Sequence, residues 1–247
     1  MSIFEYAFLI FFSLIIHKIV SQKLPSMTPN EFQQLSKDLQ SLVKIIPLNW
    51  GAVQNDSTDC QINMFKIDTF SELEQQIASL TEASKSYFRR RWFLWKNAQC
   101  DEYLFCLNKN VIQNPNAKDQ SYDLEFNANS QLRFDLKGTI IPRGFRNKIE
   151  AVVKDPTEMI QFFYDNQSVG VRNKNQNRLF LVHHSFKNQE REMPLRCNWD
   201  FKKEVYEKYA EKITSNANFI SYKEVKSDVM FLFENEDNSF TSNFFAV

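Results

Sequence analysis

Residues 122–137, YDLEFNANSQLRFDLK, decide the fold class of this chain. Polar and apolar residues alternate over 122–126 and again over 132–137, and the polar run 127–130 separates the two segments. Alternation with a period of two is typical of a β-strand that buries one face, and a short Asn-rich run is typical of a turn. The stretch therefore predicts a β-hairpin.

The turn centre at Asn129 fixes how the two strands of this hairpin pair. The expected cross-strand pairs are Asp123 with Asp135, Glu125 with Arg133, and Ser121 with Lys137. Successive side chains of a strand point to opposite faces, so the charged members share one face. The opposite, core-facing side consists of Leu124, Phe126, Leu132, Phe134 and Leu136. A slip by one residue would bury the charges, and the register is therefore strongly constrained.

The charged face of the hairpin has the composition of a metal site. Carboxylates that face each other across two strands lie ~5 Å apart and repel each other unless a cation sits between them. Mg²⁺ prefers oxygen ligands and commonly uses one or two protein carboxylates together with water and substrate phosphate. Lys137 projects beside Asp135, where it can orient water and stabilise charge on a phosphate. The competing interpretation is the solvated face of an amphipathic hairpin.

The rest of the chain alternates helical and extended patterns. Helices are expected over residues 28–46, from 69 or 71 to about 80 with a continuation or restart through 87–107, and over 155–166 and 200–213. Short apolar runs predict buried strands at 179–182 and 229–233, and a further short strand at 63–67. The predicted fold class is α/β: a mixed β-sheet flanked by helices, with an N-terminal helical extension.

This pattern predicts three regions along the chain. They are a hydrophobic N-terminal segment at 1–21, a mainly helical region at 22–85 and the α/β core at 86–247. The apolar run 3–16 is too short to cross a bilayer and has no preceding Lys or Arg. A secretory signal, a short membrane anchor, a hydrophobic helix and a start codon placed too far upstream all remain open. The protein is expected in the cytoplasm if this segment is no functional signal, and secreted or membrane-anchored otherwise.

Composition excludes several classes of function. Lys plus Arg and Asp plus Glu each number 30, so the net charge is zero and any anion-binding surface must be a local patch. The four glycines are too scattered for a Rossmann or Walker loop. Three His and no C-x-x-C pair leave zinc sites without support, and the four Cys are expected to be free, mostly buried thiols.

Asp123, eleven intervening residues and then Asp135-Leu136-Lys137 form a pattern that resembles the catalytic motif of the PD-(D/E)xK nuclease superfamily, which has the restriction-endonuclease-like fold. The resemblance covers residues 87–185 and includes the order of the elements after the hairpin. It implies that Asp123 and Asp135 bind Mg²⁺ and that Lys137 helps activate water for phosphodiester hydrolysis. Tyr122 stands where the family usually has Pro, which lowers the specificity of the match.

The family core also carries an acidic residue on the helix before the hairpin. The resemblance implies Glu102 as this residue, both as a metal ligand and as a catalytic group, with Asp101 as the alternative. His183 and His184 end a predicted strand and are expected to be structural, although one of them could reach the site.

Basic residues near the motif are candidates for phosphate contacts. They are Arg143, Arg146 and Lys148 after the second strand, and Arg172, Lys174 and Arg178 before the next one. The competing interpretation is that they lie in ordinary solvated loops. Residues 89–95, RRRWFLW, fit either a nucleic-acid surface or, as we favour, a core-facing aromatic stripe with solvated arginines.

The resemblance implies a Mg²⁺-dependent DNA endonuclease, a metal-dependent phosphodiesterase of the restriction or mobile-element defence type. Two alternatives remain: an inactive nuclease-fold module that binds nucleic acid, and a secreted or anchored binding protein. DNA is the expected partner, and homodimer formation and membrane association are left open.

Overall fold

The computed structural model describes residues 27–46, 61–116, 119, 121–166 and 176–247. Seven strands in this part of the chain form one mixed sheet in the order β1-β2-β3-β4-β6-β5, with β7 also paired to β6. The strands are β1 Val111–Gln113, β2 Leu124–Phe126, β3 Arg133–Ile140, β4 Arg178–Ser185, β5 Ile220–Tyr222, β6 Val225–Glu234 and β7 Phe240–Phe244.

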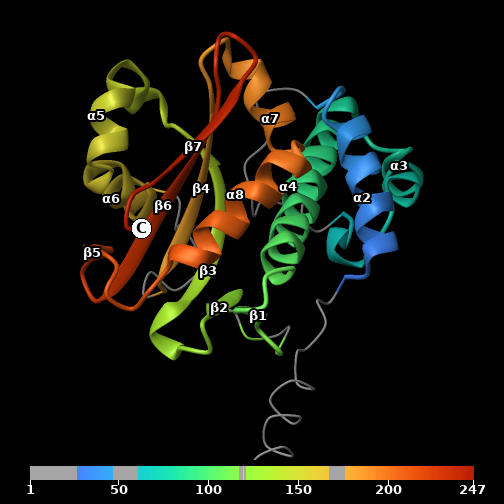
Figure 1. Cartoon of the computed structure of the whole chain (residues 1–247). Coiled ribbons are helices and arrows are strands. Elements are labelled where there is room, and N and C mark those ends of the chain that lie inside the picture. The colour runs from blue at the N-terminus through green and yellow to red at the C-terminus, as the bar shows by residue number, and fades with distance from the viewer. Residues whose placement is uncertain (1–26, 47–60, 117–118, 120, 167–175) are drawn as a thin grey trace, which may run out of the picture.

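The centre of the sheet is parallel and its flanks are antiparallel. β3, β4 and β6 run in the same direction, whereas β1, β2 and β3 form an antiparallel meander, and β5 and β7 pair antiparallel with β6. Every residue of β4 is buried, which agrees with the continuous apolar run that predicted this strand. The α/β class with a mixed sheet flanked by helices is confirmed (Figure 1).

The hairpin of β2 and β3 has the predicted register. Glu125 pairs with Arg133 and Leu124 with Phe134. The turn contains Asn127 and Ala128 with φ of 57° and 50°, the left-handed conformation that matches the twist of a tight hairpin. All five predicted core residues of the hairpin are buried: Leu124, Phe126, Leu132, Phe134 and Leu136.

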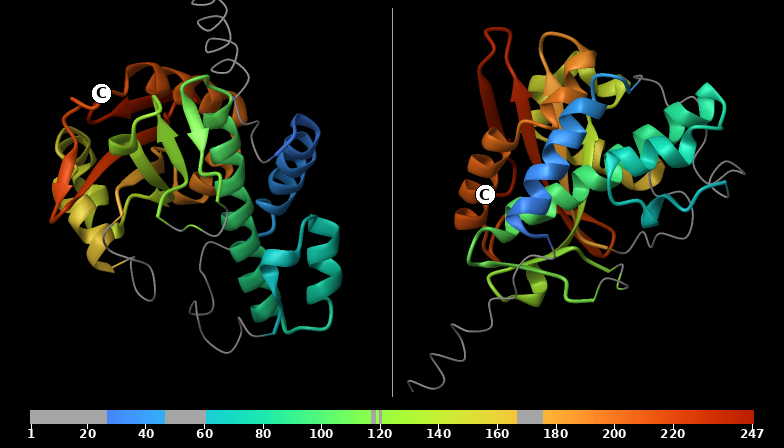
Figure 2. Two further views of the ribbon diagram at one scale, coloured as in Figure 1. Left: turned by 90° about the horizontal axis from the view of Figure 1, so that it is seen from below. Right: turned by 90° about the vertical axis from the view of Figure 1, so that its right-hand side faces the viewer.

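One face of the sheet is covered by α4 (Glu82–Cys106) and α8 (Trp199–Lys212), and α2 (Pro29–Leu42) and α3 (Phe70–Ile77) pack against α4 from outside (Figures 1 and 2). Thr28 caps α2 through a capping box with Glu31. The larger apolar core lies between this layer and the sheet. The C-terminal end of α4 lies beside β1 and β2 (Figure 1).

The opposite face of the sheet carries α5 (Ile149–Lys154) and α6 (Thr157–Asn166). Phe163 of α6 stacks on Phe180 of β4 with ring centroids 5.1 Å apart. A second, smaller apolar core lies here. The short helices α7 (Glu192–Leu195), η2 (Met64–Lys66), η3 (Ser130–Leu132), η4 (Arg143–Lys148) and η5 (Gln189–Arg191) complete the described elements.

Two local predictions were wrong, the strand at 63–67 and the end of the first helix, whereas the start of α3 was confirmed at Thr69, one of its two predicted positions. Residues 63–67 contain the 3₁₀ helix η2 (Met64–Lys66) and no strand. The N-cap of α3 is Thr69, whose side chain accepts from Glu72 N, and Ser71 lies inside the helix. α2 ends at Leu42, four residues before the predicted end. Apolar spacing alone could not separate a single 3₁₀ turn from a short strand.

The arginine-aromatic stretch of α4 lies largely in the protein interior. Arg90 and Trp92 are buried, and Arg89 forms a bidentate ion pair with Glu74 of α3. Trp92 Nε1 donates to Ile67 O at 2.9 Å. The aromatic side chains therefore pack inward, as favoured, but the arginines are engaged with the protein.

Candidate active site

The hairpin fixes Asp123 against the neighbouring strand. Asp123 N donates to Phe134 O at 2.9 Å, and Asp123 Oδ2 accepts from Leu136 N at 2.7 Å. The first predicted acid is therefore held by the backbone of β3 between Asp135 and Lys137, the other two residues of the motif. The structure brings these three predicted residues together.

Asp135 is buried and contacts two cationic side chains. Lys137 Nζ donates to Asp135 Oδ1 at 2.7 Å, and Arg178 Nε lies 3.4 Å from Asp135 Oδ2. Asp135 Oδ2 is buried and accepts no hydrogen bond from the described residues. The second acid therefore does not lie on a solvated face, because each of its carboxylate oxygens faces a cationic side chain.

The two aspartates influence each other electrostatically. The pKa of Asp123 is raised to about 6, chiefly by burial and next by the negative charge of Asp135, while Lys137 and the Leu136 amide act in the opposite direction. Mutual carboxylate repulsion is the condition that favours a bound cation. The hard oxygen donors of this pair suit Mg²⁺, with water and phosphate completing the coordination.

Glu102 of α4 lies within electrostatic reach of the pair. Burial raises its pKa to about 8, the charge of Asp123 contributes next, and Lys137 lowers it. Gln113 Nε2 of β1 donates to Glu102 Oε2 at 2.8 Å. Yet across the described ranges no three His, Cys, Asp or Glu side chains form a group that could hold a metal, so Glu102 does not join Asp123 and Asp135 as a third ligand here.

Asp101, the alternative to Glu102, belongs to the interior. It accepts a hydrogen bond from Tyr206 at 2.9 Å and forms an ion pair with the fully buried Lys202 of α8. Because these contacts hold it between the two helices, Glu102 is the acidic residue of α4 that belongs with the hairpin.

The predicted phosphate contacts after β3 lie at the other end of that strand. Ile140 ends β3 three residues after Lys137, about 10 Å along the strand, and η4 follows. Arg146 forms a bidentate ion pair with buried Glu192 at 2.7–2.8 Å, and Lys148 pairs with Glu158 at 2.9 Å. Arg143 is exposed. The structure therefore does not gather these three residues around Asp135.

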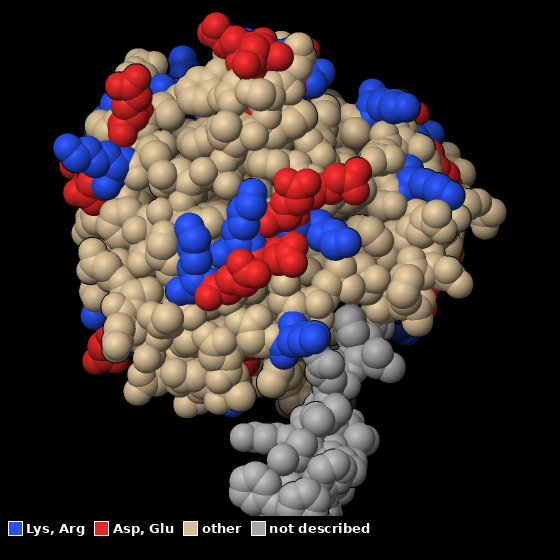
Figure 3. All heavy atoms as spheres, in the orientation of Figure 1, with Lys and Arg blue, Asp and Glu red and all other residues tan. Residues whose placement is uncertain are grey.

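Arg172 and Lys174 lie outside the described residues. Figure 3 shows that acidic and basic side chains interleave over α8, and the exposed residues there include Lys203, Glu204, Glu207 and Lys208. That face therefore has the mixed charge of a solvated helix and does not supply the local basic patch that DNA binding requires.

His183 and His184 have structural contacts. Burial lowers the pKa of His183 well below its usual value, and its Nδ1 lies 3.3 Å from Thr139 O. His184 Nδ1 lies 3.0 Å from Glu192 Oε1, in the same cluster as Arg146. Both observations agree with the structural role that was expected.

Two residues of the site were not identified as such from the sequence. Gln113 fixes Glu102 from a three-residue strand that was not predicted. Arg178 was considered as a phosphate contact, with a solvated loop as the alternative, but it opens β4, is 3% exposed and lies opposite Asp135. Its position at the start of an apolar run was the only sequence signal that it belongs to a buried strand.

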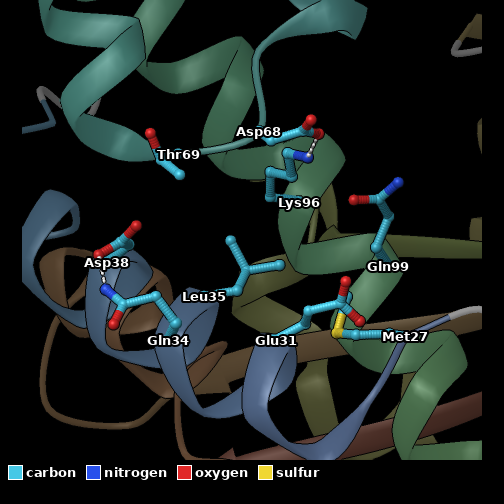
Figure 4. Close-up of a pocket in the computed structure, with 9 residues that line it drawn as sticks. All are labelled: Met27, Glu31, Gln34, Leu35, Asp38, Asp68, Thr69, Lys96 and Gln99. Carbon is cyan, nitrogen blue, oxygen red and sulfur yellow. Dashed lines mark hydrogen bonds and ion pairs between the residues drawn. The ribbon is translucent and has the colours of Figure 1, made fainter.

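A pocket of about 360 Å³ lies elsewhere, between α2, α4 and the residues just before α3 (Figure 4). Its acidic side chains are engaged: Glu31 caps α2, Asp38 accepts from Gln34, and Asp68 pairs with Lys96 at 3.2 Å. None of the hairpin residues lines it, and we assign the candidate active site to the hairpin.

The three described cysteines, Cys100, Cys106 and Cys197, are free thiols, two of them buried, as expected. None of the helices formed by the described residues combines the length and the apolar character needed to span a bilayer. The chain matches no family model, no curated protein and no solved structure.

Proposed function

We propose that the protein is a Mg²⁺-dependent phosphodiesterase that cleaves DNA, with Asp123, Asp135 and Lys137 as its catalytic residues. The observation that carries this proposal is the meeting of two repelling, largely buried carboxylates with a lysine on one end of a hairpin. The order of α4, the meander, α5 and α6, and β4 supports it, because the resemblance to the PD-(D/E)xK superfamily implies this order.

The carboxylates have the role of holding a divalent cation. Asp123 Oδ2 is committed to the Leu136 amide, which fixes the side chain, and a cation between the two aspartates would take the place of Lys137 at Oδ1 of Asp135. A bound Mg²⁺ would supply Lewis-acid polarisation of the phosphate and a water of lowered pKa.

Lys137 has the role of acting on the phosphate. Its side chain is 28% exposed, so it can turn from Asp135 toward an incoming phosphodiester without leaving the protein surface. A positive charge held there stabilises the negative charge that builds on the phosphate oxygens during attack by water. Glu102, with a pKa of about 8, keeps a proton near neutral pH and can donate a hydrogen bond beside the site.

The test is nicking of supercoiled plasmid DNA by the full-length chain with millimolar Mg²⁺, with EDTA as the negative control. Wild type should nick DNA and Asp123→Asn should not. Glu125→Gln is the matched control, because Glu125 is a carboxylate two residues after Asp123 in the same hairpin and its partner is Arg133. It should cleave like wild type.

The alternative, an inactive nuclease-fold module that binds nucleic acid, has one observation in its favour: Asp135 already contacts Lys137 and Arg178. DNA binding without cleavage by wild type under Mg²⁺ or Mn²⁺ would support that module and contradict the proposed hydrolysis.

A further inference from the structure

Arg178 and Asp135 are direct partners across the parallel strands β4 and β3. Both are buried, with 3% and 7% of their surface exposed. Arg178 Nε lies 3.4 Å from Asp135 Oδ2, and Lys137 Nζ lies 2.7 Å from Oδ1, so each carboxylate oxygen faces a different cation. A carboxylate buried to this degree loses its hydration, and nearby positive charges are needed to offset that loss.

The two cations differ in their freedom to move. Lys137 is 28% exposed and reaches the surface, whereas the side chain of Arg178 is enclosed. The guanidinium carbon of Arg178 lies 4.7 Å above the ring of Tyr164, a contact typical of cation–π stacking. The ring of Tyr164 therefore holds Arg178 in place, whereas Lys137 is the cation that can move away from Asp135.

Tyr164 is itself fixed by contacts on several sides. Its hydroxyl donates to Gln176 O at 2.9 Å and lies 2.8 Å from Ser227 Oγ of β6. Its ring stacks on Tyr222 of β5 with centroids 4.7 Å apart. Tyr164, on which Arg178 stacks, thus connects α6 with β5 and β6. The position of Arg178 is therefore set by the packed core.

We infer that Arg178 is a positioning residue for the proposed reaction: it orients Asp135 and remains as its counter-charge when Lys137 turns to the phosphate. This inference rests on the proposed function for its catalytic consequence, although the Arg178–Asp135 link can be measured without any activity. Arg178 does not act on the phosphate directly, because its buried side chain does not reach the protein surface.

The first measurement is a double-mutant cycle in thermal unfolding of the full-length chain, with wild type, Arg178→Gln, Asp135→Asn and the double variant. Arg178→Gln should lower Tm by about 3–6 °C in wild type and by less than half as much in the Asp135→Asn background. A Tm loss of equal size in both backgrounds would overturn the inference, since Arg178 would then act only through its packing on Tyr164.

The second measurement separates kcat from KM in plasmid nicking. Arg178→Gln should lower kcat about 10–100-fold, the effect expected of a residue that orients a ligand, with KM for DNA unchanged. Arg178→Lys keeps the charge and should recover part of that loss in kcat. It replaces Arg178→Gln in the comparison if the Gln variant fails to fold. A rise in KM with kcat unchanged would contradict a positioning role.

The two measurements also separate the two claims. If wild type does not nick DNA but the Tm cycle is non-additive, the proposed function fails and the assignment of Arg178 as the partner that orients Asp135 stands. If wild type nicks DNA and the cycle is additive, the proposed function stands and the role of Arg178 is wrong.

Discussion

Leu136 N donates a 2.7 Å hydrogen bond to Oδ2 of Asp123. Leu136 is the residue between Asp135 and Lys137, and its side chain is buried on the opposite face. The middle position of the motif therefore contributes its backbone amide to the site and its side chain to the core. The bond fixes the distance between the two strands at the place where the carboxylates meet.

This bond predicts how Asp123→Asn behaves. The Asn Oδ1 can accept the same amide hydrogen bond, so the fold should be retained, while the charge that Asp135 repels is removed. The free energy of unfolding at neutral pH should rise by roughly 1–3 kcal/mol, because the pKa of Asp123 is raised to about 6. Urea denaturation measures this change. A large loss of stability would mean that the two carboxylates do not repel each other in the folded protein.

Lys137→Ala should slow the chemical step and leave the carboxylates in place. Losing a group that stabilises transition-state charge typically costs about 10²–10³ in rate. The variant should fold, since Lys137 is partly exposed and Arg178 still faces Asp135. Single-turnover cleavage of a DNA duplex by wild type and variant gives the ratio. Equal rates would remove Lys137 from the catalytic set.

Arg146→Ala should destabilise the protein. It removes the bidentate partner of Glu192, which is 1% exposed, and a buried carboxylate that loses its cation typically costs about 3–5 kcal/mol. His184 Nδ1 remains 3.0 Å from Glu192 and should offset part of this loss. Arg143→Ala, three residues earlier and exposed, is the matched control and should change stability by less than about 0.5 kcal/mol. Equal, small effects would mean that the Arg146–Glu192 pair contributes little.

Asp228 predicts a pH dependence of stability. Burial raises its pKa to about 6, although Tyr209 and two backbone amides donate to it. Because the folded-state pKa lies above the unfolded value of about 3.9, its stabilisation is complete below that value and is lost as pH rises through about 6. The loss amounts to roughly 2 kcal/mol between pH 4 and pH 7.

Asp228→Asn keeps an oxygen that can accept from the two backbone amides, and its amide group does not ionise in this pH range. The difference in unfolding free energy, variant minus wild type, should therefore increase by about that amount from pH 4 to pH 7. Denaturant titrations across this range measure the difference. A constant difference would show that Asp228 does not titrate there.

The sequence was sufficient for the parts of the fold that follow a period. The hairpin register, the buried strands β4 and β6, and the helices α2 and α8 were predicted, because each buries one regular set of apolar residues. β1, β5 and β7 were missed, since β1 and β5 are three residues long and β7 is largely solvent-accessible. Strands this short owe their structure to the neighbour with which they pair.

The residues of the candidate site likewise fall into those that the sequence could predict and those that it could not. Asp123, Asp135 and Lys137 could be grouped from local spacing, because one hairpin carries all three. Arg178 could not, because its contact with Asp135 depends on the parallel pairing of β3 with β4 across 43 residues of chain. Arg146 and Lys148 were expected near the motif from their sequence distance, and the direction of β3 carries them away from it.

The measurement that tests the central claim most directly is the thermal shift produced by Ca²⁺, which occupies oxygen sites without having to support hydrolysis. Millimolar Ca²⁺, with and without DNA, should raise the Tm of wild type and of Lys137→Ala, because both keep Asp123 and Asp135. Asp135→Ala should not respond, since it lacks one of the two carboxylates proposed to hold the ion. If no variant, wild type included, responds to any divalent ion at millimolar concentration, the hairpin holds no cation and the account of the site is wrong.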